Sequence, residues 1–232
     1  MKPFNAQNRL RALTMVELLV VLAIVILLIL VILPEFARSR RYVRDPGISC
    51  VNGLKQVGLA FRIWQGDHND KFPMSVSVTN GGTLELVESG AVWRHFLVMS
   101  NELNTPKILI CPADSERQKY LASIWNGTPS APRDTIAFTG DLNTSYFIGV
   151  DAADTKTTMF LAGDRNLTVK NVALKPGLHS LATGEMVGWT KELHVNQGNI
   201  LMADASVQQF STTTLHKAFE NTGVTTNRLA IP

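Results

Sequence analysis

The sequence predicts an α+β fold in which a long N-terminal helix, half in a membrane and half outside it, packs on a small antiparallel sheet. Three observations predict this fold. An unbroken apolar run lies near the N-terminus, a helical stripe of apolar residues follows it, and the rest of the chain contains short β-branched or aromatic segments bounded by turn residues. About 200 residues remain beyond the apolar run, which is the size of one ordinary domain.

Residues 13–34 are predicted to form a single transmembrane helix. Every residue from Leu18 to Leu33 is apolar, and the segment would reach roughly 33 Å as a helix, enough to span a hydrocarbon core. Glu17 is the one ionisable residue in the segment, and a carboxylate there is costly unless it finds a partner. The basic residues that precede the segment predict a cytoplasmic N-terminus, so everything after Pro34 should face outward.

The N-terminal segment resembles the cleavage signal of type IV pilins and of type II secretion pseudopilins. A basic leader, residues 1–12, stands before the apolar run, whereas a secretory signal peptide has a small-residue cleavage site after it. Counted from Leu13, Glu17 is the fifth residue (17 − 12) and Pro34 the twenty-second (34 − 12), where that family carries Glu and often Pro. Ala12 and Leu13 replace the family's Gly and usual Phe. An ordinary signal anchor with a chance Glu17 is the alternative interpretation.

This resemblance implies that prepilin peptidase cleaves between Ala12 and Leu13 and that the new N-terminus at Leu13 is methylated. Glu17 and Pro34 would then serve assembly. The Glu17 carboxylate would pair with the N-terminal ammonium of a neighbouring subunit, and Pro34 would kink the helix rather than end it. The implied partners are prepilin peptidase, homologous pilin-like subunits, the inner membrane and the secretion or pilus assembly machinery. The chain would cross the inner membrane once, with its C-terminal domain in the periplasm, and would enter a filament on assembly.

Residues 35–66 are predicted to form the outer half of the long helix. Asp45-Pro46-Gly47 interrupts it, either as a break or as the start of a second helix capped by Asp45. Beyond this point apolar residues recur at spacings of 4, 3, 4 and 3, which places them on one stripe of a helix that ends at Gly66. The stripe consists of Cys50, Leu54, Val57, Phe61 and Trp64.

This helical segment also resembles the one that follows the membrane helix in the pilin-like families of Planctomycetes and Verrucomicrobia. Those families tend to carry a Cys-Pro pair, like Cys111-Pro112 here, and a C-terminal hairpin rich in His, Gly and Asn. The resemblance covers the N-terminal third of the chain closely and the rest loosely. The resemblance indicates how such proteins are exported and assembled, and it does not indicate the specific function of this chain.

The two cysteines, Cys50 and Cys111, form an even pair in a part of the chain that should meet an oxidising compartment. This favours a disulfide between them, and two separate buried thiols are the alternative. A bridge would close a loop of about 60 residues and requires Cα atoms roughly 4.4–6.8 Å apart. The sequence contains no Cys-x-x-Cys motif and no histidine cluster that would predict a metal site.

The headpiece, residues 67–232, is predicted to contain short strands with long connections. Helical pieces are expected at residues 90–99 and 214–220, and a long connection at residues 115–144. The predicted strands are residues 107–111, 144–150, 157–162, 199–203 and 206–210, of which the last two form a hairpin around Asp204-Ala205.

The sequence contains no motif that indicates enzyme activity. It contains no Gly-x-Ser-x-Gly, His-Glu-x-x-His or phosphate-binding glycine motif, so we expect no catalytic residues, no enzyme activity and no cofactor. Gly163-Asp164-Arg165-Asn166 is expected to be a turn whose Asp and Asn bond the local backbone, with a binding loop as the alternative. The histidines lack ligand spacing, and each is expected to be a surface or structural residue: His68, His95, His179, His194 and His216.

A bound calcium ion is the alternative to the expected absence of a cofactor, because the resemblance implies the calcium loop that major pseudopilins carry. Five carboxylates near strand ends offer hard oxygen ligands, although they form no recognisable loop motif. These are Asp141, Asp151, Asp154, Asp164 and Asp204.

The charge balance argues against a nucleic-acid partner. The formal net charge is +3, and the leader alone supplies +3 through Lys2, Arg9 and Arg11, so the cleaved chain would be neutral (3 − 3). A basic cluster at residues 38–44 is expected to meet lipid headgroups or acidic neighbours at the membrane surface.

The expected function is that of a structural subunit of a type II secretion or type IV pilus-type filament. The alternative is a binding module, displayed on such a filament or anchored in the membrane, for adhesion or for recognition of polysaccharide or secreted protein. An exposed aromatic cluster drawn from Trp93, Trp125 and Trp189 would favour this alternative.

Overall fold

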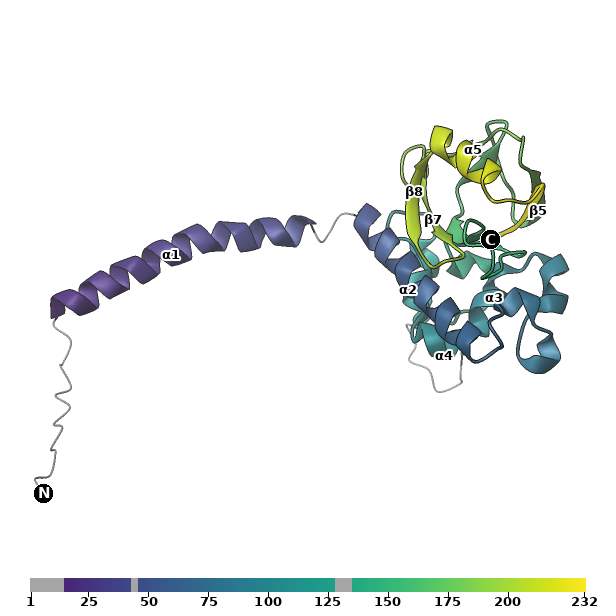
Figure 1. Cartoon of the computed structure of the whole chain (residues 1–232). Helices are drawn as coiled ribbons and strands as arrows, with labels where there is room; N and C mark the ends of the chain where they lie inside the picture. Colours follow the sequence, from purple (N-terminus) through teal and green to yellow (C-terminus); the bar gives the residue numbers. More distant parts are fainter. Residues whose placement is uncertain (1–14, 43–45, 128–134) are drawn as a thin grey trace, which may run out of the picture. The chain divides into compact units, whose positions relative to one another are not determined.

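The computed structural model describes residues 15–42, 46–127 and 135–232 (Figure 1). These residues belong to two units, of which the first contains helix α1 (Met15–Tyr42) and the second, residues 46–232, contains every other described element. The second unit combines helices with antiparallel sheets, so the predicted α+β class is correct. The leader, residues 1–12, and the cleavage site at Ala12 and Leu13 lie outside the described residues.

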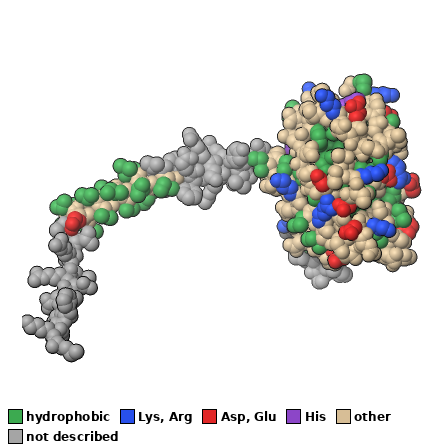
Figure 2. Space-filling model, in the orientation of Figure 1, with side chains coloured by type: hydrophobic (Ala, Val, Ile, Leu, Met, Phe, Trp, Pro, Cys, Tyr) green, Lys and Arg blue, Asp and Glu red, His purple; other side chains and the backbone are tan. Residues whose placement is uncertain are grey.

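Helix α1 contains the apolar run and exposes it. Its large apolar side chains from Met15 to Leu30, and that of Ile32, are between 47% and 79% exposed, and Figure 2 shows them as a continuous apolar stretch. Pro34 lies inside the helix, as predicted, and does not end it. Among the residues that the structure describes, none of the helices satisfies both the length and the hydropathy that a membrane crossing requires. Leu13, where the predicted span begins, lies outside those residues, and the span stays a prediction.

Helix α2 (Pro46–Gly66) is the predicted second helix, and it ends at Gly66 as expected. Pro46 suits the first helical position because its fixed φ is already helical and no N–H is needed there. The predicted stripe is buried: Cys50, Leu54, Val57 and Phe61 are fully buried and Trp64 is 3% exposed. Asp45, the suggested cap, lies outside the described residues.

A six-stranded antiparallel sheet with the order β5-β9-β1-β2-β7-β8 forms the centre of the second unit. Strands β7 and β8 are the predicted hairpin, and the Asp204 carboxylate accepts the Ser206 N–H at 2.8 Å in its turn. The strands are β1 (Tyr146–Gly149), β2 (Phe160–Asp164), β5 (Gly177–Ala182), β7 (Gln197–Met202), β8 (Val207–Ser211) and β9 (Thr226–Ile231).

Helices cover both faces of this sheet. Successive side chains of a strand point to opposite sides, so each strand can contribute to a core on either face. Ile148 and Leu201 belong to the core shared with α2, whereas their neighbours Phe147 and Ile200 belong to the core shared with α5 (Thr212–Glu220). Figure 1 shows α2 and α5 on opposite sides of the strands. The predicted packing of the outer helix on a small antiparallel sheet is therefore present within the second unit.

A smaller antiparallel sheet, with the order β4-β3-β6, continues the core next to α5. Its strands are β3 (Leu167–Val169), β4 (Val172–Ala173) and β6 (Val187–Trp189). None of these three short strands was predicted, and neither were β5 and β9.

Short helices build the region between α2 and β1, where the prediction of a strand at residues 107–111 is wrong. Pro106 has no N–H to give to a strand ladder, and the Thr105 hydroxyl accepts the Lys107 N–H at 3.4 Å, so a 3-10 helix begins here instead. The helices of this region are α3 (Val92–Leu97), α4 (Ser100–Leu103), η1 (Pro73–Ser75), η2 (Val78–Asn80), η3 (Leu84–Ser89), η4 (Pro106–Leu109), η5 (Gln118–Tyr120) and η6 (Asp141–Asn143).

Candidate functional site

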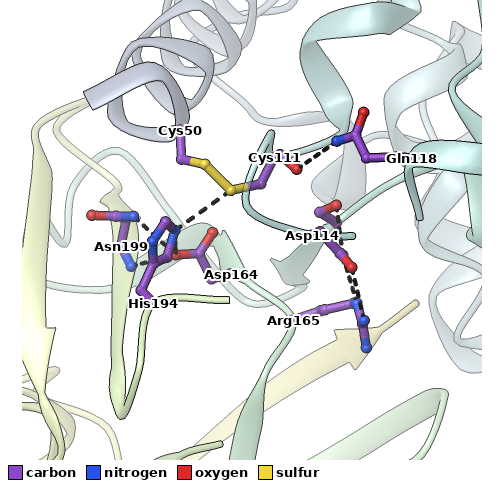
Figure 3. Close-up of a disulfide and its surroundings, with 9 residues drawn as sticks. Cys50, Cys111, Asp114, Gln118, Asp164, Arg165, His194 and Asn199 are labelled. Atoms are coloured by element: carbon purple, nitrogen blue, oxygen red, sulfur yellow. Dashed lines mark hydrogen bonds and ion pairs between the residues drawn. A yellow bond between two sulfur atoms is a disulfide. The ribbon is translucent and has the colours of Figure 1, made fainter. Parts of the chain in front are cut away.

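Cys50 and Cys111 form a disulfide in the structure, as the sequence led us to expect (Figure 3). Cys50 lies in α2, and Cys111 follows η4, so the bridge ties the helix to the segment that leads toward the sheet. Their Cα atoms are 5.0 Å apart, within the range for a disulfide, and both residues are fully buried. The 61-residue separation makes this a cross-link that closes a long loop.

His194 lies against this bridge, although its sequence position gave no reason to pair it with the cysteines. Its Nε2 atom is 3.5 Å from Cys111 Sγ and 3.4 Å from Asp164 Oδ2, and its side chain is 7% exposed. The residue comes from the loop between β6 and β7, where Val195 and Asn196 both adopt left-handed backbone angles. This turn places the imidazole beside the sulfur (Figure 3).

Asp164 ends strand β2 and is completely buried. Its Oδ2 atom accepts hydrogen bonds from the backbone N–H and the side-chain amide of Asn199, at 2.6 and 3.0 Å. Burial raises the pKa of Asp164 to about 7, and the Asn199 hydrogen bonds oppose that rise. Its second oxygen, Oδ1, is buried without a hydrogen-bond partner among the described residues.

Tyr146 adds a second buried polar atom to this region, because it stands directly opposite Asp164 in the β1–β2 ladder. Its hydroxyl has no partner among the described residues, and burial, helped by the nearby Asp164 charge, raises its pKa well above the usual range. A Cβ atom at Gly53 would lie 3.0 Å from this hydroxyl, so the glycine leaves room for it. The disulfide therefore sits beside an unusually polar part of the core.

Arg165, the next residue in the chain, forms a separate ion-pair cluster. Its Nε and Nη2 atoms bind the two Asp114 oxygens at 2.8 and 3.0 Å, and Nη2 also reaches Glu116 at 2.8 Å. Burial would raise the pKa of Asp114, but the hydrogen bonds and charge of Arg165 outweigh this effect and lower it. This arrangement has the geometry of a structural bidentate pair.

The expectation of a simple turn at Gly163-Asp164-Arg165-Asn166 is therefore wrong. Gly163 and Asp164 belong to β2, and the Asn166 amide donates to the Thr190 carbonyl at 3.2 Å. These side chains bind distant segments rather than the local backbone, because the segment joins the two sheets in the buried part of the unit.

The five carboxylates considered for calcium do not gather at one place in the described part of the chain. The one group there that brings three potential metal ligands together contains none of them. Four of them bond to separate partners: Asp141 to the Trp93 N–H, Asp151 to Arg228, Asp154 to Arg62 and Asp204 to the Ser206 N–H.

That group consists of Cys50, Cys111 and His194, whose ligand atoms all lie within 4.8 Å of one another. In the disulfide form the sulfurs are bonded to each other and are not available as thiolate ligands. The oxidised site is thus a buried cross-link with a histidine and a carboxylic acid beside it.

The residues expected to serve assembly and ligand display have the following places. Glu17 lies in the first turn of α1, and Pro34 lies in the same helix. Trp93 and Trp125 are half-buried and Trp189 is buried, so these three form no exposed aromatic cluster.

Comparison of the chain with known protein families, with curated proteins and with solved structures finds no match. The structure itself establishes the class of an α+β protein with antiparallel sheets.

Proposed function

We propose that this chain is a pilin-like structural subunit of a type II secretion or type IV pilus-type filament, held in the inner membrane by the predicted span of residues 13–34 before assembly. The observation that carries this proposal is the exposed apolar surface of α1, whose large side chains from Met15 to Leu30 are at least 47% exposed. A helix that is apolar all round is stable only where lipid or other helices cover it. A membrane supplies the first kind of cover, and neighbouring subunits in a filament supply the second.

The leader supports the filament over a plain membrane anchor, because its resemblance to a prepilin signal predicts cleavage between Ala12 and Leu13. Cleavage would create an ammonium group at Leu13, and methylation would leave its charge in place. The Glu17 carboxylate of one subunit would then pair with the Leu13 ammonium of the next. Such a pair fixes the register between packed apolar helices, since a subunit docked out of step would bury both charges unpaired.

The second unit would form the outer surface of the filament and its contacts with neighbouring subunits. A binding module is the weaker alternative, because the tryptophans that would suit carbohydrate or protein recognition are buried or half-buried. This role of structural subunit needs no catalytic residues, no cofactor and no nucleic acid.

Intact mass of the membrane-extracted chain tests the processing step. The full chain should be co-expressed with prepilin peptidase, and the expected product begins at Leu13 with one methyl group on its amine. A mature chain that begins elsewhere, or an uncleaved chain, would contradict the proposal.

The variant Glu17→Leu separates membrane insertion from assembly. It should insert and be cleaved like the wild type, because neither step needs the carboxylate, but it should not enter sheared filaments. The matched control is Glu220→Leu, which removes an exposed carboxylate from α5 and should leave the filament yield unchanged. A normal filament yield from Glu17→Leu would show that the carboxylate does not direct assembly.

A further inference from the structure

We propose that the dithiol form of this chain binds a zinc ion through Cys50, Cys111 and His194, and that Asp164 moves from its place beside the histidine to supply the fourth ligand. Either the disulfide or the bound metal would then join α2 to the segment that leads toward the sheet.

The first support is the convergence of the four side chains, which come from four separate segments (Figure 3). Cys50 lies in α2, Cys111 follows η4, Asp164 ends β2, and His194 precedes β7. The ligand atoms of the two cysteines and the histidine lie within 4.8 Å of one another, and His194 Nε2 also lies 3.4 Å from Asp164 Oδ2. One point in space is therefore within reach of Cys50, Cys111 and His194, and Asp164 lies beside the histidine but outside this group.

The second support is the match of two distances to a tetrahedral site. Zinc binds sulfur at about 2.3 Å and nitrogen or oxygen at about 2.0–2.2 Å, so adjacent S and N ligands should be about 3.6 Å apart and adjacent N and O ligands about 3.4 Å apart. The observed separations from His194 Nε2 are 3.5 Å to Cys111 Sγ and 3.4 Å to Asp164 Oδ2. Each of these two separations is one that neighbouring ligands of a tetrahedral zinc ion would have.

The third support is the polar character of the surroundings, which the disulfide does not explain. A structural cross-link needs only two cysteines, yet a histidine and a carboxylic acid are buried beside it. Asp164 Oδ1 and the Tyr146 hydroxyl are buried without hydrogen-bond partners among the described residues. Such atoms are rare in folded proteins, and a cation beside Asp164 would compensate for the burial of its carboxylate.

The donor set selects zinc rather than calcium. Two thiolates, one imidazole and one carboxylate form a tetrahedral set of sulfur, nitrogen and oxygen ligands that suits Zn²⁺, whereas Ca²⁺ takes six to eight oxygen ligands. Metal binding involves no electron transfer. Each thiol loses its proton to solvent, the two sulfurs separate to about 3.8 Å across the ion, and four metal–ligand bonds form. Formation of the disulfide instead removes two electrons and two protons, which a second dithiol–disulfide protein would accept by exchange.

Cobalt provides the probe for the experiment, because tetrahedral Co²⁺ with thiolate ligands absorbs visible light and zinc does not. The full chain, in detergent micelles, should be reduced with tris(2-carboxyethyl)phosphine in denaturant and refolded by dilution. We expect one equivalent of Co²⁺ to give thiolate and tetrahedral absorption bands, and one equivalent of Zn²⁺ to abolish them. The oxidised chain should give neither band. A dithiol chain without these bands would overturn the proposal.

Variants distinguish a folded site from thiols that bind metal in an unfolded chain. His194→Ala should weaken zinc binding at least tenfold, and Asp164→Asn should weaken it by a smaller factor. His216→Ala, which changes a partly exposed histidine on α5, is the matched control and should bind like the wild type. Equal affinity of His194→Ala and the wild type would overturn the proposal.

Thermal unfolding supplies a readout that is independent of the cobalt spectrum. Zinc should raise the Tm of the dithiol chain, because it would bind the folded form in preference to the unfolded one. It should leave the Tm of the oxidised chain unchanged. Zinc binding without a rise in Tm of the dithiol chain would show that the metal does not use the folded geometry, and would refute the site.

Discussion

Helices α1 and α2 follow one another in the sequence and are both rich in apolar residues, but they differ in whether those residues are buried. Leu27 on α1 is 62% exposed, whereas Leu54 on α2 is fully buried against the rest of its unit. The apolar residues of α1 form an unbroken run, and those of α2 recur at helical spacing. The spacing of apolar residues, rather than their number, therefore tells whether a helix finds its partner within the chain.

The largest expected effect on the free energy of unfolding comes from loss of the Cys50–Cys111 disulfide, which links α2 to the rest of the second unit. The double variant Cys50→Ala with Cys111→Ala should lower the free energy of unfolding by about 4 kcal/mol, because the open chain gains the entropy of a long loop. Urea unfolding of the full chain in micelles with EDTA measures this change. Reduction should lower the stability of the wild type and leave the variant unchanged. A loss below about 1 kcal/mol would show that packing alone holds α2.

The next effect tests the contrast between the two helices directly. Leu54→Ala should lower the free energy of unfolding of the second unit by about 2–5 kcal/mol, because it leaves a cavity in the core. Leu27→Ala is the matched control on α1, and it should leave this free energy unchanged. Fluorescence of the tryptophans, all of which lie in the second unit, reports this unfolding. Equal losses from both variants would break the contrast.

An intermediate effect should appear with pH, because the core beside α2 contains a buried histidine. His95 is fully buried, its Nδ1 lies 2.7 Å from the Thr83 hydroxyl oxygen, and burial lowers its pKa from 6.5 to about 4. Between these two values the unfolded chain binds the proton and the folded chain does not. Stability is therefore complete above pH 6.5 and falls as the pH drops toward 4, with a loss of about 2 kcal/mol at pH 5.

The variant His95→Gln tests this pH dependence by removing the titrating group. The difference between the free energies of unfolding at pH 7.5 and pH 5 should be about 2 kcal/mol smaller in the variant than in the wild type. Asp164, whose raised pKa acts with the opposite sign, is present in both chains and cancels in the comparison. An unchanged pH profile would show that folding does not lower the pKa of His95.

The smallest effect concerns the other face of α2. Leu59 is 60% exposed, so Leu59→Ala should change the free energy of unfolding by no more than about 0.5 kcal/mol. Compared with Leu54→Ala, this variant removes the same atoms from the same helix. A large loss at Leu59 would mean that this face is also covered.

The elements that the sequence predicts well carry their signal locally. The buried stripe of α2 follows from spacing alone, and the β7–β8 hairpin follows from two apolar segments around Asp204-Ala205. Strand β4 carries no such signal, because Val172 and Ala173 are both exposed and form a strand only through their pairing with β3. Short strands of this kind depend on the tertiary structure, which a local pattern does not contain.

The residues of the candidate site also differ in whether the sequence predicts that they come together. The pairing of Cys50 with Cys111 could be predicted because the chain has only these two cysteines. The approach of His194 could not, since 83 residues separate it from Cys111 and its position depends on the loop that enters β7. Contact between residues so far apart in the sequence depends on the order of the strands in the sheet, and the spacing of residues along the chain does not predict it.

The place of β9 in the sheet has a consequence for the order in which the chain can fold during synthesis. Among the described strands β5 pairs with β9 alone, and 44 residues (226 − 182) separate the two strands. At about 5–20 residues per second, the ribosome needs about 2–9 s to add this segment. During that interval β5 has no ladder partner and β1 has one open edge, and open strand edges invite pairing with other chains. A folding helper that acts on this chain would be needed most in those seconds.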